Sequence, residues 1–285
     1  MKKLFGFTLS EVMITLGLLG VLAAMTIPTL TYNYRSRLLE SQFRTTYSDI
    51  QEIGSFFNNE EGDIGEYALK SSFSKWVSGF MSHISGSKKY RSVTYSKIAT
   101  YLRKLYKEGG SFGGPYSFGQ TRRDKANATI YCDNSGIWTD SKGRIWTFQS
   151  EGRVICVDVN GTASPNMYNV DIFAFVPMTA KQVAQWVYGD SADNSSEYTG
   201  QFVLCDADAF RNGSNKRDKC SEGPHKAPGQ KVTNANTTGC NLDYCPYNWP
   251  IENVAPYYTN VVSKNRVGKP VQKGDNYWRD YIQYK

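Results

Sequence analysis

The chain has very little histidine, a residue that enzymes commonly use for proton transfer and metal binding. It has two histidines in 285 residues, which argues against histidine-based catalysis and multi-histidine metal sites. It has no Gly-Lys-Ser/Thr sequence, so a phosphate-binding loop is not expected. Its net charge of +7 is spread along the chain without any run of five like charges, so nucleic-acid binding is not indicated. With 40% hydrophobic residues the chain should fold, and no nucleophile with an adjacent base stands out.

The N-terminus contains a long apolar run. Residues 7–30 carry a single charge, Glu11, and Lys2 and Lys3 precede them. As a helix these 24 residues would extend about 36 Å, which is enough to cross a hydrocarbon core of about 30 Å. Lysines before the apolar run favour a cytoplasmic N-terminus. The run is therefore expected to span a membrane once.

The apolar run fits three kinds of N-terminal segment to different degrees. A secretory signal peptide cut near Ala23 is opposed by the length of the run and by Glu11 at its start. An uncleaved anchor leaves Glu11 unexplained, because a carboxylate near the bilayer centre costs about 2.5–3.5 kcal/mol and normally has a partner. Cleavage between Gly6 and Phe7 supplies that partner, since the new amine lies four residues from Glu11.

The segment from Gly6 to Glu11 (GFTLSE), followed by apolar residues, resembles the signal of type IV pilins and type II secretion pseudopilins. The resemblance implies that a prepilin peptidase cuts after Gly6 on the cytoplasmic side and methylates the new N-terminal Phe7. It also implies that Glu11 pairs with the terminal amine of a neighbouring subunit during filament assembly. Pro28 stands where family members usually carry a helix-kinking proline. The resemblance covers only about the first 55 residues and does not settle the rest of the chain.

Beyond Pro28 the helix is expected to continue, but with apolar residues along one side only. Apolar residues recur at three- and four-residue steps from Leu39 to Phe57, which predicts an amphipathic helix packed on a globular domain. Gly62 is the expected stop signal. The whole chain is therefore expected to consist of five segments: a leader (1–6), a transmembrane and filament-core helix (7–30), its amphipathic continuation (31–61), an αβ pilin-like domain (62–188) and an irregular cysteine-containing C-terminal region (189–285).

The remaining pattern predicts an α+β fold. Helical spacing of apolar residues predicts helices over 66–84, 95–107 and 178–188. Period-two spacing and β-branched or aromatic residues predict strands over 128–132, 144–148, 154–159, 171–176, 201–204 and 257–262. Residues 140–143 are expected to form a hairpin turn between two of these strands. We therefore expect the long N-terminal helix to pack on an antiparallel sheet, with disulfides pinning the irregular C-terminal region.

The six cysteines are Cys132, Cys156, Cys205, Cys220, Cys240 and Cys245. An even number in an exported chain favours three disulfides, for which fifteen pairings are formally possible. Sequence neighbours suggest the pairs 132–156, 205–220 and 240–245. A structural zinc site is the alternative, but the Cys-x-x-Cys pairs usual for zinc are absent and only His225 lies near the cysteines.

Asp158, Asn160 and Asp171 predict a calcium site. Carboxylate and amide oxygens at alternate positions, with Gly161 following, suit a hard cation. Major type II pseudopilins have a calcium loop in their C-terminal region, so the resemblance supports Ca²⁺ here. The alternative interpretation is a polar turn between two strands.

We therefore expect a structural subunit, either a major or a minor pilin or pseudopilin, rather than an enzyme. Its precursor would cross the inner membrane once, and the mature subunit would lie in a periplasmic or cell-surface filament. The implied partners are prepilin peptidase, other pilin or pseudopilin subunits, the inner-membrane assembly machinery and the membrane itself. The alternative is a membrane-anchored extracytoplasmic binding protein or adhesin that does not polymerise.

Overall fold

The fold is α+β. The computed structural model describes residues 8–91, 117–120, 127–129, 132, 136–163, 168–188, 197–205, 247–255 and 269–282. Its helices are α1 (Leu9–Glu60), α2 (Ile64–Lys70), α3 (Phe73–Ser82), α5 (Ala180–Tyr188) and α7 (Trp249–Glu252), with a 3₁₀ turn η1 (Glu151–Arg153) and a π-helical turn η6 (Tyr277–Tyr281). Its strands are β1 (Lys88–Arg91), β2 (Ser117–Gln120), β3 (Asn127–Thr129), β4 (Ile137–Thr139), β5 (Ile145–Phe148), β6 (Ile155–Asp158), β7 (Ile172–Met178) and β8 (Gln201–Cys205).

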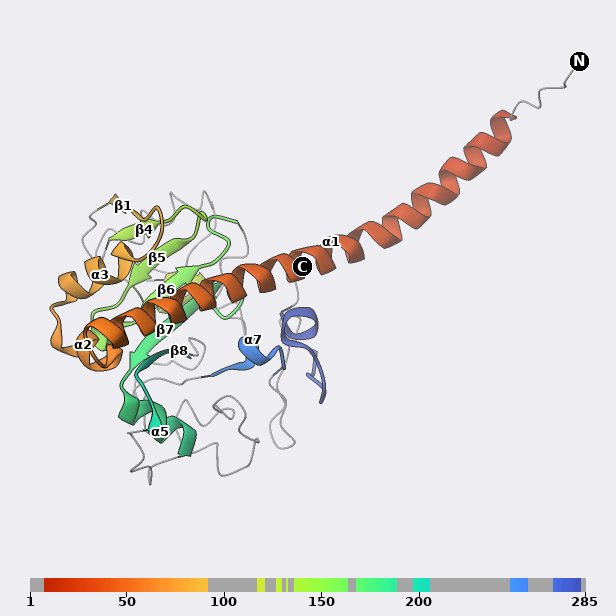
Figure 1. The fold of residues 1–285 in the computed structure, drawn as a ribbon. Helices are drawn as coiled ribbons and strands as arrows, with labels where there is room; N and C mark the ends of the chain where they lie inside the picture. The colour runs from red at the N-terminus through yellow and green to blue at the C-terminus, as the bar shows by residue number, and fades with distance from the viewer. Residues whose placement is uncertain are drawn as a thin grey trace, which may run out of the picture.

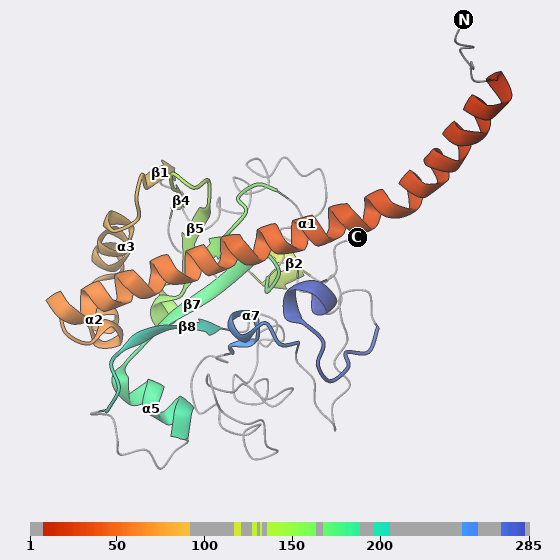
Figure 2. The same cartoon turned by 45° about the vertical axis from the view of Figure 1, so that its right-hand side comes forward.

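Helix α1 dominates the shape of the molecule. It has 52 residues, which corresponds to about 78 Å at about 1.5 Å per residue. Its N-terminal half projects from the domain, and its C-terminal half crosses the sheet (Figures 1 and 2). The helix ends before Gly62, whose φ of +88° is a conformation that glycine adopts without steric cost. Its buried positions confirm the predicted amphipathic half: Ser36, Leu39, Phe43, Thr46, Ile50, Ile53, Gly54 and Phe57.

The prediction of one helix over 66–84 was wrong, because two helices meet at Ser71 and Ser72. Ser71 ends α2 with an extended backbone (φ −75°, ψ 149°). The hydroxyl of Ser72 accepts a hydrogen bond from the backbone N–H of Lys75 at 3.3 Å and so begins α3. Serine side chains compete with the helical hydrogen-bond pattern and favour helix caps. Apolar spacing did not reveal the break, since Leu69 and Phe73 fit one helical stripe.

Strands β1, β4, β5, β6, β7 and β8 form a six-stranded sheet in that order, and every neighbouring pair is antiparallel. Helix α1 lies across one face of this sheet in both views (Figures 1 and 2). It also covers the β8 edge, because Gln51 Nε2 donates to the Phe202 carbonyl at 2.7 Å and Asn58 Nδ2 donates to the Gly200 carbonyl at 2.6 Å. Side chains of α1 thus pair backbone groups that an edge strand would otherwise expose.

Aromatic side chains fill the core between helix and sheet. The Phe43 ring of α1 lies 4.6 Å from that of Phe173 in β7 and 5.1 Å from that of Trp278 in η6, measured between ring centroids. One side chain therefore joins the helix, the sheet and the C-terminal segment. The largest fully buried side chains are Trp76, Trp146, Trp278, Tyr168, Tyr247, Tyr277, Tyr281, Phe43, Phe80, Phe148 and Phe173.

Most of the strand predictions are confirmed. Strands β5, β6, β7 and β8 correspond to the segments predicted at 144–148, 154–159, 171–176 and 201–204, and α5 corresponds to 178–188. The hairpin turn at 140–143 is also present, but its first strand is β4, which the sequence did not predict. Residues 127–129 instead form β3, which pairs with β2 in a separate two-stranded sheet. With three residues, β4 is too short to show a period of two.

The predicted disulfide between Cys132 and Cys156 is confirmed, with the two Cα atoms 6.0 Å apart. Cys205 is buried in β8. Its predicted partner Cys220, together with Cys240 and Cys245, lies outside the described residues, as do the helix predicted at 95–107 and the strand predicted at 257–262. The C-terminal region is less irregular than expected, since its described parts contain β8, α7 and η6.

Candidate functional site

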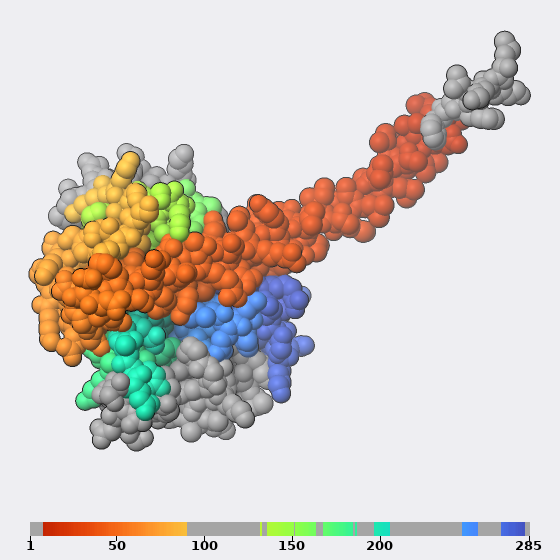
Figure 3. Space-filling view, in the orientation of Figure 1, coloured from red at the N-terminus to blue at the C-terminus, as the bar shows by residue number. Residues whose placement is uncertain are grey.

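The N-terminal half of α1 presents an exposed apolar surface. Of the described helices, α1 is long and apolar enough to cross a membrane, and none of its most apolar 18-residue window is buried. Large apolar side chains from Leu9 to Leu30 are between 41% and 79% exposed. Figure 3 shows this half standing clear of the domain. Such a surface is unfavourable in water and favourable in lipid or against other apolar helices.

Helix α1 continues through Pro28. This proline lies inside the helix, where it lacks the N–H that would donate to the carbonyl of residue 24. Figure 2 shows the projecting half curving away from the line of the half that crosses the sheet. The role of Pro28 in bending α1 where it leaves the bilayer remains a prediction.

Thr8 and Glu11 close the N-terminus of α1 with a reciprocal cap. The Thr8 hydroxyl accepts from the Glu11 backbone N–H at 3.2 Å. Glu11 Oε2 accepts from the Thr8 backbone N–H and from the Thr8 hydroxyl, both at 2.8 Å. Two backbone N–H groups that the helix leaves without partners are thus satisfied. Glu11 Oε1 accepts no hydrogen bond from any residue in the described ranges, and so it can bind a further donor.

Glu11 has no cation nearby on its own helix. The next basic residue along the chain is Arg35, 24 residues on, or about 36 Å away along a continuous helix. A membrane-embedded carboxylate normally has a partner. The described part of α1 therefore supplies no cation to Glu11.

The middle of α1 is held by residues 276–282, which we call the C-terminal clasp. The Ser36 hydroxyl donates to the Trp278 carbonyl, and the Tyr32 hydroxyl donates to the carbonyls of Arg279 and Ile282. In Figure 1 the clasp lies beside α1 at the point where the helix leaves the domain. The sequence did not predict the clasp, although Asn276 caps it by accepting from the Arg279 N–H at 3.0 Å.

Two ionisable groups at the clasp, Tyr32 and Asp280, have shifted pKa values. Burial raises the pKa of the Tyr32 hydroxyl, and the Asp280 carboxylate raises it further, so this hydroxyl stays a neutral donor. Hydrogen bonds from the Arg279 side chain and the Asn276 N–H lower the pKa of Asp280 against the opposing effect of its burial. A carboxylate with a lowered folded-state pKa stabilises the fold above its ordinary pKa, and this contribution is lost as the pH falls through the lowered value. The clasp is therefore expected to weaken in acid through Asp280, and also in strong alkali, where the Tyr32 hydroxyl loses the proton that it donates to the clasp.

A buried ion network joins α1 to the turn between β4 and β5. Arg144 Nε contacts Asp140 Oδ2 at 2.5 Å, and Arg144 Nη1 contacts Asp49 Oδ2 of α1 at 2.7 Å. The Trp146 indole N–H donates to the same oxygen of Asp140 at 2.9 Å. Lys142 Nζ, at the edge of the network, is 2.7 Å from Asp49 Oδ2. This network fixes the orientation of α1 on the sheet.

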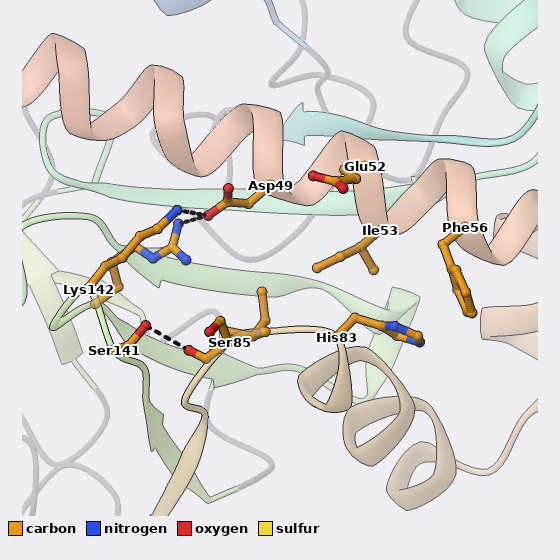
Figure 4. A pocket seen from close by; sticks show the side chains of 10 residues that line it. Asp49, Glu52, Ile53, Phe56, His83, Ser85, Ser141 and Lys142 are labelled. Atoms are coloured by element: carbon orange, nitrogen blue, oxygen red, sulfur yellow. Dashed lines mark hydrogen bonds and ion pairs between the residues drawn. The ribbon is translucent and has the colours of Figure 1, made fainter.

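Next to the network lies a cleft of about 280 Å³. Figure 4 shows it between α1 and the end of α3, with Ile53 and Phe56 on the α1 side. The His83 ring centroid lies 4.2 Å from that of Phe56. At the other end Asp49 and Lys142 pair with each other. Among the residues that line this cleft, no nucleophile lies beside a base in the arrangement that covalent catalysis needs.

The structure brings the three predicted calcium ligands together at the end of β6. Asp158 Oδ1 accepts from the Asn160 backbone N–H at 3.2 Å, and Asn160 Nδ2 donates to Asp171 Oδ2 at 3.3 Å. Asp158 and Asp171 are fully buried. The buried Asn160 Oδ1 has no hydrogen-bond partner among the described residues. Those residues contain no group of three or more His, Cys, Asp or Glu side chains that could hold a metal.

Gly161 explains why the loop after β6 turns tightly. Its φ is +68°, and a Cβ at this position would meet the Gly143 carbonyl oxygen at 2.4 Å. The loop after β6 therefore packs directly on the turn between β4 and β5. Gly6 and Phe7, the predicted processing site, lie outside the described residues.

Comparison with known proteins identifies the N-terminal segment. Residues 1–27 match a family model described as the prokaryotic N-terminal methylation motif. This match confirms the resemblance that rests on the segment from Gly6 to Glu11. No curated protein and no solved structure matches the chain.

Proposed function

The chain begins with the signal of type IV pilins and pseudopilins, and from this premise we propose that it is a structural subunit of a type IV pilus or type II secretion-type filament, not an enzyme. The observation that carries the proposal is the apolar half of α1, which is exposed along its length and has Glu11 in its first turn, hydrogen-bonded to the N-cap Thr8. A helix that is apolar on all sides is stable in lipid or among other apolar helices. Both environments are available to a subunit that leaves a membrane to enter a filament.

Processing prepares this helix for assembly. The precursor lies in the inner membrane with Lys2 and Lys3 on the cytoplasmic side, where prepilin peptidase cleaves after Gly6 and methylates Phe7. Cleavage removes both lysines and leaves a charged amine four residues from Glu11. The amine and the apolar helix then enter the filament together.

The ion pair of Glu11 determines the axial position of the neighbouring subunit. Its Oε2 is held by Thr8, so Oε1 faces a donor from outside the cap. In apolar surroundings an ion pair is much stronger than in water, and a carboxylate without a partner is costly. The Phe7 amine of a neighbouring subunit satisfies the carboxylate and fixes the axial register of the two helices.

Filament assembly involves three kinds of partner: prepilin peptidase, other pilin or pseudopilin subunits, and the inner-membrane assembly machinery.

The alternative function is a membrane-anchored extracytoplasmic binding protein or adhesin that does not polymerise. The cleft beside Phe56 gives that alternative a binding surface, but it assigns no role to Glu11. The mature subunit is accordingly expected in a periplasmic or cell-surface filament.

Changing Gly6 to arginine tests the processing step. We expect Gly6→Arg protein to keep its leader and its Met1 N-terminus, because the peptidase acts after this glycine. Intact mass of the membrane-extracted protein measures the outcome. Gly17→Ala is the control, since an added Cβ at Gly17 meets no atom within 4 Å beyond the neighbouring backbone of its own helix, and it should be processed like wild type. Normal cleavage of Gly6→Arg would contradict the proposed processing.

We also propose that Asp158, Asn160 and Asp171 bind Ca²⁺. The unpartnered, buried Asn160 Oδ1 supports this proposal, because a buried polar atom without a partner is destabilising. Carboxylate and amide oxygens are the ligands that Ca²⁺ prefers. A bound ion would supply positive charge next to two buried carboxylates and would tie the loop after β6 to β7.

Calcium should raise the thermal stability of the full-length protein in detergent. A hundredfold excess of Ca²⁺ over its dissociation constant would stabilise the fold by about 2.7 kcal/mol. Asn160→Ala should lose this shift, and Asp275→Asn, in a different turn, should keep it. Unchanged melting of the wild-type protein on addition of Ca²⁺ would refute the site.

A further inference from the structure

We propose that the segment where α1 leaves the membrane binds the headgroups of anionic phospholipids. The surface consists of Tyr34, Arg35 and Arg37, which we call the basic collar. This inference goes beyond filament assembly: it needs the membrane span of α1, and it does not need polymerisation.

The position of the collar follows from the length of the apolar run. From Leu9 to Leu30 the helix rises about 33 Å, which matches a hydrocarbon core of about 30 Å. Arg35 and Arg37 lie five and seven residues beyond Leu30, or about 8–11 Å further along the axis. In an α-helix the Cα–Cβ bonds tilt toward the N-terminus. The two guanidinium groups can therefore reach back toward the headgroup layer.

The charge of the collar is uncompensated within the described protein. Arg35 and Arg37 are exposed, and neither guanidinium forms an ion pair or hydrogen bond with a residue of the described ranges. Two nearby acids already have partners: Glu40 pairs with Arg44 at 2.9 Å, and Asp280 of the C-terminal clasp pairs with Arg279 at 2.8 Å. The collar thus presents two free positive charges.

The arrangement of the side chains around α1 suits a lipid surface. At 100° per residue, Arg35 and Arg37 project from opposite flanks of the helix, on either side of Ser36, which is buried against the clasp. Tyr34, which is 66% exposed, lies on the outer face between them. The collar therefore contacts lipid around most of the helix and leaves one side to the domain.

Charge complementarity identifies the occupant as an anionic phospholipid. Guanidinium groups bind phosphate oxygens in a bidentate manner, and tyrosine is enriched at membrane interfaces, where its ring lies at headgroup level. The surface is continuous with the apolar span, so lipid is the phosphate source that lies beside it. Each basic residue near an anionic membrane surface strengthens binding about fivefold. Two arginines should together give a preference of about 25-fold.

The test uses the mature full-length protein in vesicles of equal parts phosphatidylcholine and phosphatidylglycerol. After mild detergent extraction, native mass spectrometry counts the phospholipids retained by each subunit. Wild type should retain phosphatidylglycerol preferentially, and Arg35→Gln/Arg37→Gln should reduce this preference at least tenfold. Lys70→Gln is the matched control, because Lys70 is an exposed cation that pairs with Glu66 at 2.6 Å in α2, away from the collar, and it should retain the preference.

Several outcomes would overturn the inference. An unchanged preference in the double variant, or no preference in the wild type, would contradict it. Displacement of the lipid by an equal concentration of inorganic phosphate would show a free-anion site instead. Vesicle flotation separates this test from the proposed function: a chain that fails to float contradicts the membrane span itself, whereas a chain that floats without lipid preference contradicts only the collar. Both arginines are exposed, so the double variant should melt at the wild-type temperature.

Discussion

Glu11→Leu protein is expected to remain in the membrane but to disappear from filaments. Leucine makes the apolar run more hydrophobic, so insertion is retained. Removing one partner of a buried ion pair costs about 3–5 kcal/mol, which corresponds to a hundredfold or greater loss of assembly. The measurement is the ratio of subunit in sheared surface material to subunit in the membrane fraction, determined by immunoblot for variant and wild type.

Glu11→Gln separates charge from helix capping. Glutamine can accept the hydrogen bonds that Thr8 donates to Glu11, as it does in capping boxes, but it carries no charge. We therefore expect Glu11→Gln to fail in assembly as Glu11→Leu does. Glu60→Gln changes an acid of the same helix outside the membrane and should assemble normally. Wild-type assembly of Glu11→Gln would show that the ion pair is unnecessary.

Arg144→Met should destabilise the domain by about 3–5 kcal/mol. The Arg144 side chain is 4% exposed and contacts Asp140 and Asp49. Methionine would leave the buried Asp140 carboxylate without its cation and would remove the guanidinium from the Trp146 ring, whose centroid is 4.9 Å away. Denaturant unfolding of the full-length protein in detergent, followed by tryptophan fluorescence, measures the change in the free energy of unfolding.

Lys142→Met is the matched control for this prediction. Lys142 contacts the same oxygen of Asp49 at the same distance of 2.7 Å as Arg144, but its side chain is 46% exposed. Exposed ion pairs contribute about 0–1 kcal/mol, so the control should change stability by less than about 1 kcal/mol. An equal loss of unfolding free energy in the two variants would mean that the burial of Arg144 does not determine how much its ion pairs contribute to stability.

Much of this fold can be predicted from local sequence patterns. The helical stripe from Leu39 to Phe57 identifies the face of α1 that packs on the sheet, and period-two segments identify β5 to β8. The pairing of Cys132 with Cys156 follows from their closeness in the chain. In contrast, β4 has three residues and is defined mainly by its partners β1 and β5. The split between α2 and α3 depends on the serine caps, which apolar spacing does not detect.

In the candidate site, too, some contacts can be predicted from local sequence and others cannot. The contact between Thr8 and Glu11 spans three residues, so the signal segment contains both partners. The anchorage of α1 depends on residues far away in the chain: Arg144 reaches Asp49 across 95 positions, and Tyr32 reaches the clasp across about 250. No local pattern specifies such contacts. They arise when α1, the β4–β5 turn and the C-terminus pack into one core.

The central claim is that cleavage after Gly6 creates the amine that Glu11 binds in the filament. Intact mass and N-terminal sequencing of wild-type protein from sheared surface material test this claim most directly. We expect the protein to begin at Phe7 and to carry one added methyl group on its terminal amine. Protein that begins at Met1, or at a residue beyond the apolar run, would contradict it.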